Sequence, residues 1–161
     1  MTIEIVQYDS QHIDGVASVI VPIQQIEFGI SITLDAQPDL QDISGFYQRG
    51  TGNFWVAVAD NDVVGTIGLL DIGNNQAALR KMFVKPSFRG PEYRIAKRLL
   101  ERLLDWCKEY RIRDVYLGTT AKFLAAHRFY EKHGCREIAV DRLPASFPIM
   151  AVDTKFYELR L

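Results

Sequence analysis

The chain has 161 residues, of which 48% are hydrophobic and 24% charged, a composition typical of one globular domain with a buried core. Its 19 basic and 20 acidic residues give a formal net charge of −1, so neither a nucleic-acid footprint nor a polybasic membrane patch is indicated. We therefore expect a single domain over residues 1–161 that binds no nucleic acid and no membrane.

The N-terminal third predicts a strand followed by helices. Residues 3–8 alternate enough for a first strand, and residues 12–27 carry apolar side chains at near-helical spacing. Pro22 predicts that this second segment is bent or split into two helical pieces. A further helix start, with proline and acids in its first turn, is predicted at residues 35–40, and Gly50 ends that helix.

The first residues give no targeting signal, because they lack the basic head and long apolar run of a signal peptide. No apolar stretch of the chain approaches the ~18 residues that cross a membrane. Cys107 and Cys135 have no Cys-x-x-Cys spacing and form no metal-ligand pattern with the histidines. We expect a cytoplasmic setting, two buried and unreactive thiols, and no bound metal.

Three apolar runs follow, at residues 53–59, 63–70 and 77–84. Short turn-forming segments join them, at residues 60–62 and 71–76, so a three-stranded antiparallel meander is the simplest arrangement.

A long amphipathic helix is predicted over residues 91–110, with apolar side chains on one broad face and charges opposite. The turn Arg89-Gly90-Pro91 precedes it. A helix start leaves its first amide groups unpaired at the positive end of the helix dipole, so this junction suits a phosphate. Gly90 permits close backbone approach, Pro91 suits the first helical position, and Arg89 adds a charged fork. The other interpretation is an ordinary strand-to-helix turn.

The C-terminal part predicts a buried strand at residues 115–117 and a helix at residues 121–132 that ends at Gly134 in a left-handed conformation. Two more strands are expected, at residues 135–140 and 154–161. This order of elements is that of an α/β fold with a mixed sheet.

Two segments share their pattern with a known family. Within residues 82–97, the residues Arg89-Gly90 and Arg94-Ile95-Ala96 match approximately the turn pattern Gln/Arg-x-x-Gly-x-Gly/Ala. Residues 126–135, with the sequence AHRFYEKHGC, match approximately the pattern Ala-x-x-x-Tyr-x-Lys-x-Gly-Phe. Together these segments resemble the acyl-CoA-binding core of the GNAT superfamily of N-acetyltransferases.

The chain departs from the family patterns at four places. Two extra residues lie in the turn, Arg94 replaces a glycine, Phe123 replaces an asparagine, and Cys135 replaces an aromatic residue. The Arg94 replacement bears on how closely the backbone can approach a phosphate, and the Phe123 replacement removes a polar contact to the pantetheine arm.

The resemblance implies a GNAT-like fold, with a mixed, mostly antiparallel central sheet flanked by helices. It also implies acetyl-CoA as the acyl donor and an amine as the acceptor. The residues that it places at the cofactor are Met82, Phe83, Val84, Arg89, Gly90, Arg94, Ile95, Ala96, Lys97, Thr119 and Phe123.

Tyr130 occupies the position where the family often uses a tyrosine to protonate the coenzyme A sulfur. A phenol that titrates near ~10 stays protonated at neutral pH and is available as a general acid. The other interpretation is that Tyr130 only packs beside Phe129.

A general base is also required, and Glu27 is its candidate, because the region after the first helix lines the acceptor site in the family. Asp35 and Asp39 are near it in sequence. The alternatives are that Glu27 is a solvated helical charge and that the two aspartates are helix-start residues. If these acids face the cleft, they favour a cationic acceptor such as a polyamine, an amino sugar, an amino acid or a lysine side chain.

The leading hypothesis is therefore an N-acetyltransferase that moves an acetyl group from acetyl-CoA directly to a primary amine of a small molecule or peptide. The alternative is a non-catalytic acyl-CoA-binding sensor of the same fold. The exposed edges of the sheet make a homodimer one possible assembly.

Overall fold

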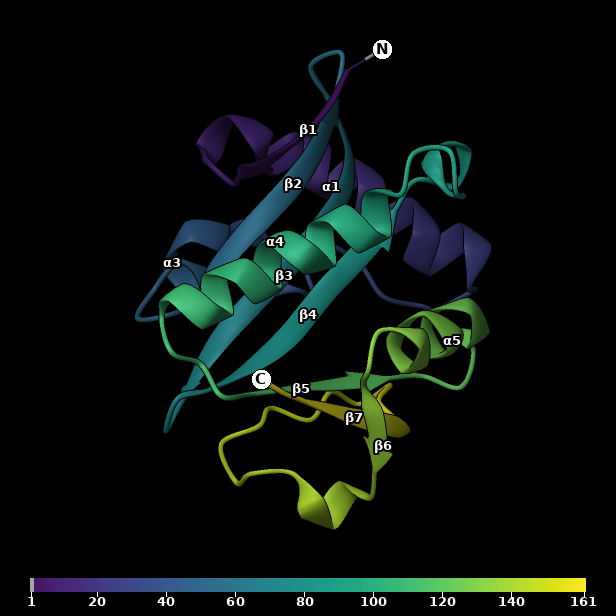
Figure 1. Ribbon diagram of the computed structural model, residues 1–161. Helices are drawn as coiled ribbons and strands as arrows, with labels where there is room; N and C mark the ends of the chain where they lie inside the picture. Colours follow the sequence, from purple (N-terminus) through teal and green to yellow (C-terminus); the bar gives the residue numbers. More distant parts are fainter. Residues whose placement is uncertain (1) are drawn as a thin grey trace.

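The computed structural model describes residues 2–161, which form one seven-stranded sheet with helices on both faces (Figure 1). The strand order is β1-β2-β3-β4-β5-β7-β6, and every neighbouring pair is antiparallel except β4 and β5. The predicted α/β fold with a mixed, mostly antiparallel sheet is confirmed. The strands are β1 (Ile3–Gln7), β2 (Asn53–Ala59), β3 (Asp62–Gly73), β4 (Gln76–Val84), β5 (Asp114–Thr119), β6 (Arg136–Ile138) and β7 (Lys155–Arg160).

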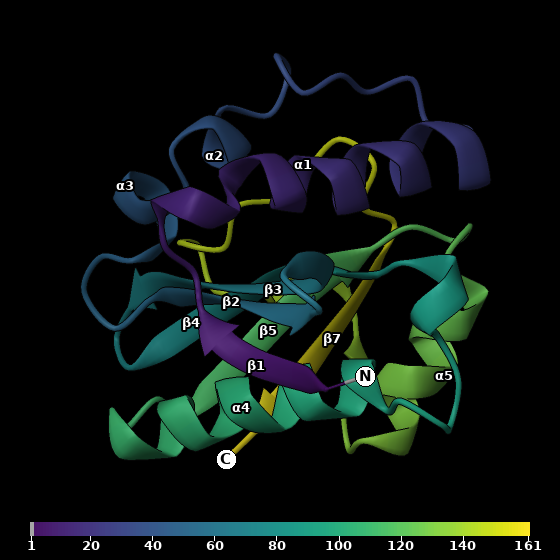
Figure 2. The same cartoon turned by 90° about the horizontal axis from the view of Figure 1, so that it is seen from above.

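The helices form two layers (Figure 2). On one face of the sheet lie α1, α2 and α3; on the other lie α4 and, beside β5 and β7, α5. The helices are α1 (Ile13–Pro22), α2 (Pro38–Gln41), α3 (Ile43–Tyr47), α4 (Ile95–Glu109) and α5 (Leu124–Lys132), with the shorter helical segments η1 (Ser10–His12), η2 (Ile23–Glu27), η3 (Pro86–Phe88) and η4 (Val140–Arg142). The four-turn amphipathic α4 is thus one wall of the molecule.

Alternating side chains of the central strands fill the two layers. Trp55 packs in the cluster that contains the buried leucines of α4, whereas its neighbours Phe54 and Val56 pack with the buried residues of α1 and α3. Adjacent strand residues point to opposite faces, so a single strand serves both cores. Close contact with α4 also requires Gly65 in β3, because a Cβ at that position would lie 3.0 Å from Ile95 Cγ2.

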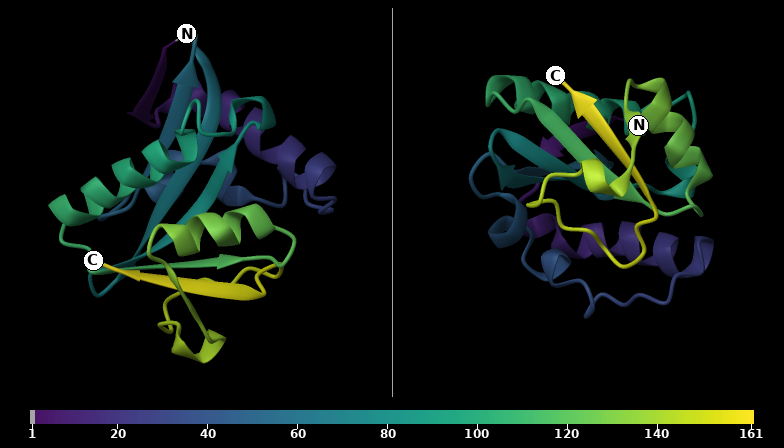
Figure 3. Two further views of the ribbon diagram at one scale, coloured as in Figure 1. Left: turned by 45° about the vertical axis from the view of Figure 1, so that its right-hand side comes forward. Right: turned by 90° about the horizontal axis from the view of Figure 1, so that it is seen from below.

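Strands β4 and β5 part soon after they meet (Figure 3). They pair only where Gln76–Ala78 of β4 run beside residues 114–116, although β4 continues to Val84 and β5 to Thr119. Beyond the paired residues, β5 keeps its whole length against β7. The sheet therefore opens along the later residues of β4. In a regular sheet, a central strand such as β4 would be hydrogen-bonded along both edges.

A β-bulge lies in β4 at this opening. Thr66 of β3 pairs with Phe83 and Gly68 pairs with Arg80, so Lys81 and Met82 together stand opposite a single residue. Lys81 has a left-handed backbone with φ of +55°, and its carbonyl oxygen accepts a hydrogen bond from the Thr66 hydroxyl at 2.7 Å. The bulge resets the alternation of side chains along the strand.

The structure corrects the predictions for two helices, of which the start of α4 matters most for the site. The helix begins at Ile95, four residues after the expected position, and Pro91 lies in the preceding turn. Arg94 precedes the helix in a left-handed conformation with φ of +53°, which a residue with a side chain adopts less readily than glycine.

The prediction of two helical pieces that meet at Pro22 is confirmed, because α1 ends at Pro22 and the π-helical η2 follows directly. The second correction concerns the next helix. The helix expected from residues 35–40 onward is instead two short helices, α2 and α3, divided at Asp42, which caps α3 by accepting a hydrogen bond from the Gly45 amide at 3.0 Å. Asp39 stands in the first turn of α2, as one alternative predicted, and is buried there.

The packing of α4 predicts a stability effect at Leu99, which is fully buried against β3. Leu99→Ala is expected to lower the free energy of unfolding by about 2–5 kcal/mol, through lost burial and the cavity left behind. Urea unfolding followed by circular dichroism measures this. Lys108→Ala on the exposed side of the same helix is the control, with an expected change within ~0.5 kcal/mol. Equal effects of the two substitutions would contradict the packing described for α4.

Candidate active site

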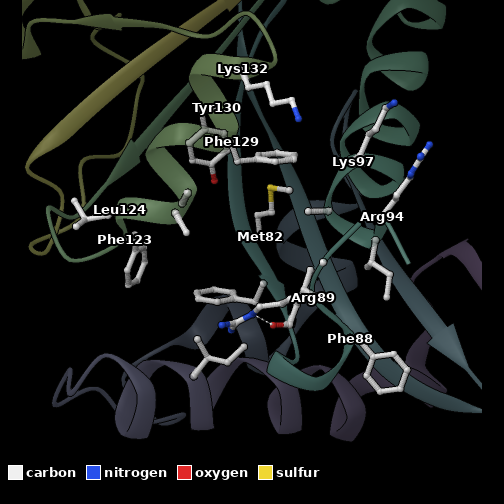
Figure 4. A pocket seen from close by; sticks show the side chains of 18 of the residues that line it. Met82, Phe88, Arg89, Arg94, Lys97, Phe123, Leu124, Phe129, Tyr130 and Lys132 are labelled. Carbon is white, nitrogen blue, oxygen red and sulfur yellow. Dashed lines mark hydrogen bonds between the residues drawn. The ribbon is translucent and has the colours of Figure 1, made fainter. Parts of the chain in front are cut away.

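A cavity of about 900 Å³ occupies the opening of the sheet (Figure 4). Its walls come from the end of η2, the last residues of β4, the turn and first residues of α4, and one side of α5. Of the residues singled out from the sequence, those that line it are Glu27, Met82, Phe83, Val84, Arg89, Gly90, Arg94, Ile95, Ala96, Lys97, Phe123 and Tyr130. Thr119 does not line this cavity.

The first turn of α4 supplies positive charge to one end of this cavity. Ile95, Ala96 and Lys97 line it, no side chain caps the helix, and no acidic residue stands in the first turn. The unpaired amides and the helix dipole are therefore not neutralised by the helix itself. The side chains of Arg94 and Lys97 add two cations beside the same turn (Figure 4). This end of the cavity suits a phosphate group.

Arg89 and Glu27 form an ion pair across the cavity wall (Figure 4). Both guanidinium Nη atoms donate to the Glu27 carboxylate, at 2.7 and 2.8 Å, and Arg89 Nε donates to the Val84 carbonyl at 2.9 Å. The pair ties η2 to the turn before α4. The two residues that the sequence assigned to separate roles, phosphate binding and base catalysis, are thus bound to each other.

Tyr130 lies between the large cavity and a second one. Its hydroxyl points into the large cavity between Met82 and Phe123 (Figure 4) and makes no hydrogen bond with another of the residues 2–161. The side chain is only 6% exposed, and burial, followed by the neighbouring Cys135, raises the pKa of its hydroxyl. The phenol therefore stays protonated and keeps its proton available for a bound molecule.

The second cavity, of about 140 Å³, adjoins the first on the α1 side of β4. The two cavities share Met82, Phe83, Phe123, Ala126 and Tyr130. Phe123 also packs against Phe28, with ring centroids 4.3 Å apart and the ring planes tilted by 54°. Thr119 lines this second cavity rather than the first. The arrangement is a long cavity with a positive end that meets a small pocket at a buried tyrosine.

Three charged residues of the second cavity were missed by the sequence analysis, namely Arg80, Lys81 and Asp153. The side chains of Arg80 and Lys81 are 11% and 9% exposed, and both lie near the buried Asp39, with nitrogen-to-Oδ2 distances of 3.9 and 3.7 Å. Burial lowers the pKa of Lys81 and raises that of Asp153. Two adjacent cations in an otherwise apolar strand were the signal available in the sequence.

Neither Asp35 nor Asp39 lines either cavity. Asp39 instead accepts a hydrogen bond from the Tyr47 hydroxyl at 2.6 Å. Its carboxylate contacts Arg80 and Lys81 from outside the cavity. Among residues 2–161, no cluster of three histidine, cysteine or acidic side chains is placed to hold a metal ion, and no helix has the length and apolar character needed to cross a membrane.

The sequence model of the Acetyltransferase (GNAT) family matches residues 21–135, a segment that contains β4, its bulge and the start of α4. The chain belongs to this family. A GNAT-family acetyltransferase of Staphylococcus aureus Mu50 has the same fold over 99% of both chains, with a TM-score of 0.94 and 41% sequence identity. The predicted family membership is confirmed.

Two further proteins are similar to this GNAT protein. N-acetylaspartate synthetase of Danio rerio is 39% identical over 102 residues, which are 62% of this chain and 36% of that protein. The chain therefore spans about a third of the length of that relative. The PaiA N-acetyltransferase of Thermoplasma acidophilum, whose crystal structure contains coenzyme A, has a TM-score of 0.76 over the whole length of both chains, but its 18% identity shows the fold alone.

The burial of the two thiols predicts their reactivity. Burial raises the pKa of Cys107 to about 12 and that of Cys135 to about 11, so almost no thiolate exists at neutral or mildly alkaline pH. We expect Ellman's reagent to label neither cysteine rapidly in the native protein and to label both in denaturant. Rapid labelling of one thiol in the native protein would reveal a nucleophile that the structure places out of reach.

Proposed function

We propose that this chain acts as one N-acetyltransferase domain that moves an acetyl group from acetyl-CoA directly to a primary amine of a small molecule or peptide. The observation that carries the proposal is the meeting of the two cavities at Tyr130 and Met82. One cavity has the length and the positive end for a nucleotide-bearing donor, and the other has room for a small acceptor. N-acetylaspartate synthetase, by its name, makes an acetylated amino acid, and an amino acid is one such amine.

In this proposal the diphosphate of acetyl-CoA binds at the first turn of α4. The amides of Ile95, Ala96 and Lys97 and the side chains of Arg89 and Arg94 supply the contacts, and Gly90, with φ of +113°, leaves the turn free of a side chain there. Support comes from the uncompensated helix start and from the position of these residues along one cavity.

The pantetheine arm then runs beside the free edge of β4. Its amides add to Met82, Phe83 and Val84 as an extra strand would, because β5 no longer pairs with β4 at these residues. A backbone N–H of the same segment is placed to hold the thioester carbonyl and to stabilise the oxyanion that forms there. Phe123, the residue before α5, packs against the arm on the other side of the opening.

Transfer forms the C–N bond between the amine and the acetyl carbon and breaks the C–S bond. The departing sulfur takes a proton from Tyr130. Because burial raises the pKa of Tyr130 still further above the ~8.5 of a thiol, a free phenolate is disfavoured. We infer that Tyr130 gains the proton of the attacking nitrogen as it gives its own to sulfur, and so works as a relay.

The amine must arrive deprotonated, and Glu27 is the general base predicted from the sequence. It lines the large cavity, which in this proposal is the donor cavity, and its carboxylate is bound by Arg89. As a base it would act through water while that ion pair persists. This role stays a prediction, and Asp153 is a second carboxylate near the junction, on the acceptor side.

Tyr130→Phe tests the relay. We expect kcat to fall about 100-fold or more, as for loss of a general acid, with little change in KM for acetyl-CoA because the ring remains. The pKa of the wild-type hydroxyl is raised above ~10. We therefore expect that deprotonation of Tyr130 causes no fall in the kcat of the wild-type protein below that pH. Steady-state release of coenzyme A over a pH series measures both. A fully active variant would show that water or another acid protonates the sulfur.

Arg89 and Glu27 are tested together by calorimetric titration of acetyl-CoA. Arg89→Ala should weaken binding by about 1–3 kcal/mol through loss of a charge-assisted phosphate contact. Glu27→Gln frees the guanidinium from its carboxylate partner and should bind acetyl-CoA at least as tightly as the wild-type protein. An unchanged dissociation constant in Arg89→Ala would remove Arg89 from the phosphate site. Tight binding in the wild-type protein without coenzyme A release on any amine would favour a sensor.

A further inference from the structure

The bulge in β4 brings two neighbouring cations to the second cavity, which in the proposed function is the acceptor cavity. In a regular strand, adjacent side chains point to opposite faces of the sheet, and Lys81 would then point toward α4. The extra residue resets the alternation, so that Leu79 and Val84, five positions apart, both pack in the cluster of α4. Arg80 and Lys81 consequently lie on the same side, and both line the acceptor cavity.

Arg80 and Lys81 also contact polar residues that do not line the cavity. Asp39 Oδ2 lies 3.9 Å from an Arg80 nitrogen and 3.7 Å from Lys81 Nζ, and the Tyr47 hydroxyl fixes the same oxygen. Lys81 Nζ also donates to Gln37 Oε1. One carboxylate therefore lies beside two partly buried cations in the structure without a ligand.

Arg80 has hydrogen-bond donors to spare. A guanidinium carries five N–H groups, yet within residues 2–161 its one hydrogen bond goes from Nη2 to the Met150 sulfur at 3.4 Å. The guanidinium also lies beside the Asp39 carboxylate, at 3.9 Å, and over the rings of Phe46 and Tyr47, with centroids 5.6 and 5.8 Å from the guanidinium carbon. A partly buried guanidinium that lines a cavity and has free donors is a strong site for a carboxylate, which it can bind through two oxygens.

We propose that the acceptor is a small amino acid whose carboxylate binds Arg80 and Lys81. The inference rests on the proposed acetyltransferase function and names the substrate class of its acceptor cavity. The cavity volume of about 140 Å³ is close to the ~150 Å³ that holds a benzene molecule, so a molecule of amino-acid size fits.

The third charge of the cavity, Asp153, suits the ammonium group of the same amino acid. Its Oδ2 accepts a hydrogen bond from the Met150 amide at 2.9 Å, whereas Oδ1 accepts none from residues 2–161. Two cations and one carboxylate thus line a pocket that meets the donor cavity at Tyr130. Charges of both signs match an amino acid better than a polyamine, which offers only cations.

The test compares amino acids with their amides in a coenzyme A release assay. Amidation removes the negative charge at nearly constant size, so kcat/KM is expected to fall about 10- to 100-fold when the recognised carboxylate is amidated. Aspartate, asparagine and aspartate 1-amide separate a side-chain carboxylate from an α-carboxylate, and pairs such as alanine and alaninamide test acceptors with one carboxylate. Putrescine and glucosamine are acceptors without a carboxylate.

Variants identify the residues responsible. Arg80→Gln and Lys81→Gln should each raise KM for the amino acid about 10-fold or more and leave the acetyl-CoA dissociation constant unchanged, which also reports that the donor site has folded. Asp153→Asn should likewise raise KM for the amino acid. Lys108→Gln, on the exposed side of α4, is the matched control and should change neither quantity.

The outcomes separate this inference from the function on which it rests. Turnover that is equal for acids, amides and carboxylate-free amines, or an unchanged amino-acid KM in both cation variants, would overturn the inference while the acetyltransferase function stands. Absence of acetyl-CoA binding by the wild-type protein would overturn the proposed function itself, and with it the assignment of the acceptor.

Discussion

The early parting of β4 and β5 is the constraint on which the rest of the structure depends. A central strand normally has both edges paired, because an unpaired backbone group away from water loses the free energy of a hydrogen bond. Here the two parallel strands pair over three residues and then separate, while the antiparallel pairing of β5 with β7 and the packing of α4 on β3 hold each half of the sheet in place. The opening between them becomes the large cavity.

The bulge at Lys81 gives the second cavity its two cations. One extra residue in β4 carries Arg80 and Lys81 to the α1 side and returns Met82 and Val84 to the α4 side. The same short segment therefore presents backbone to one cavity and cations to the other. Because Asp39 and Tyr47 come from the two short helices α2 and α3, the charged residues of the second cavity are contacted by elements that do not line the large cavity.

Local patterns made most of the fold predictable, and long-range contacts explain the rest. The strand at residues 53–59 was predicted with its observed bounds, because apolar runs between turn residues are local signals. The start of α4 was misplaced because Pro91 suits a helix start as well as a turn, and the left-handed Arg94 has no sequence signal. The residues of the donor cavity could be named from the family pattern. The ion pair of Glu27 with Arg89 could not, since it joins residues far apart in the chain.

A crystal structure of the protein with a non-transferable acetyl-CoA analogue tests the central claim most directly. The account predicts the diphosphate at the amides of residues 95–97, the pantetheine arm beside Met82–Val84 in the place that β5 leaves empty, and the sulfur within hydrogen-bond reach of the Tyr130 hydroxyl. An analogue bound outside the opening between β4 and β5, with that edge of β4 unchanged, would contradict it.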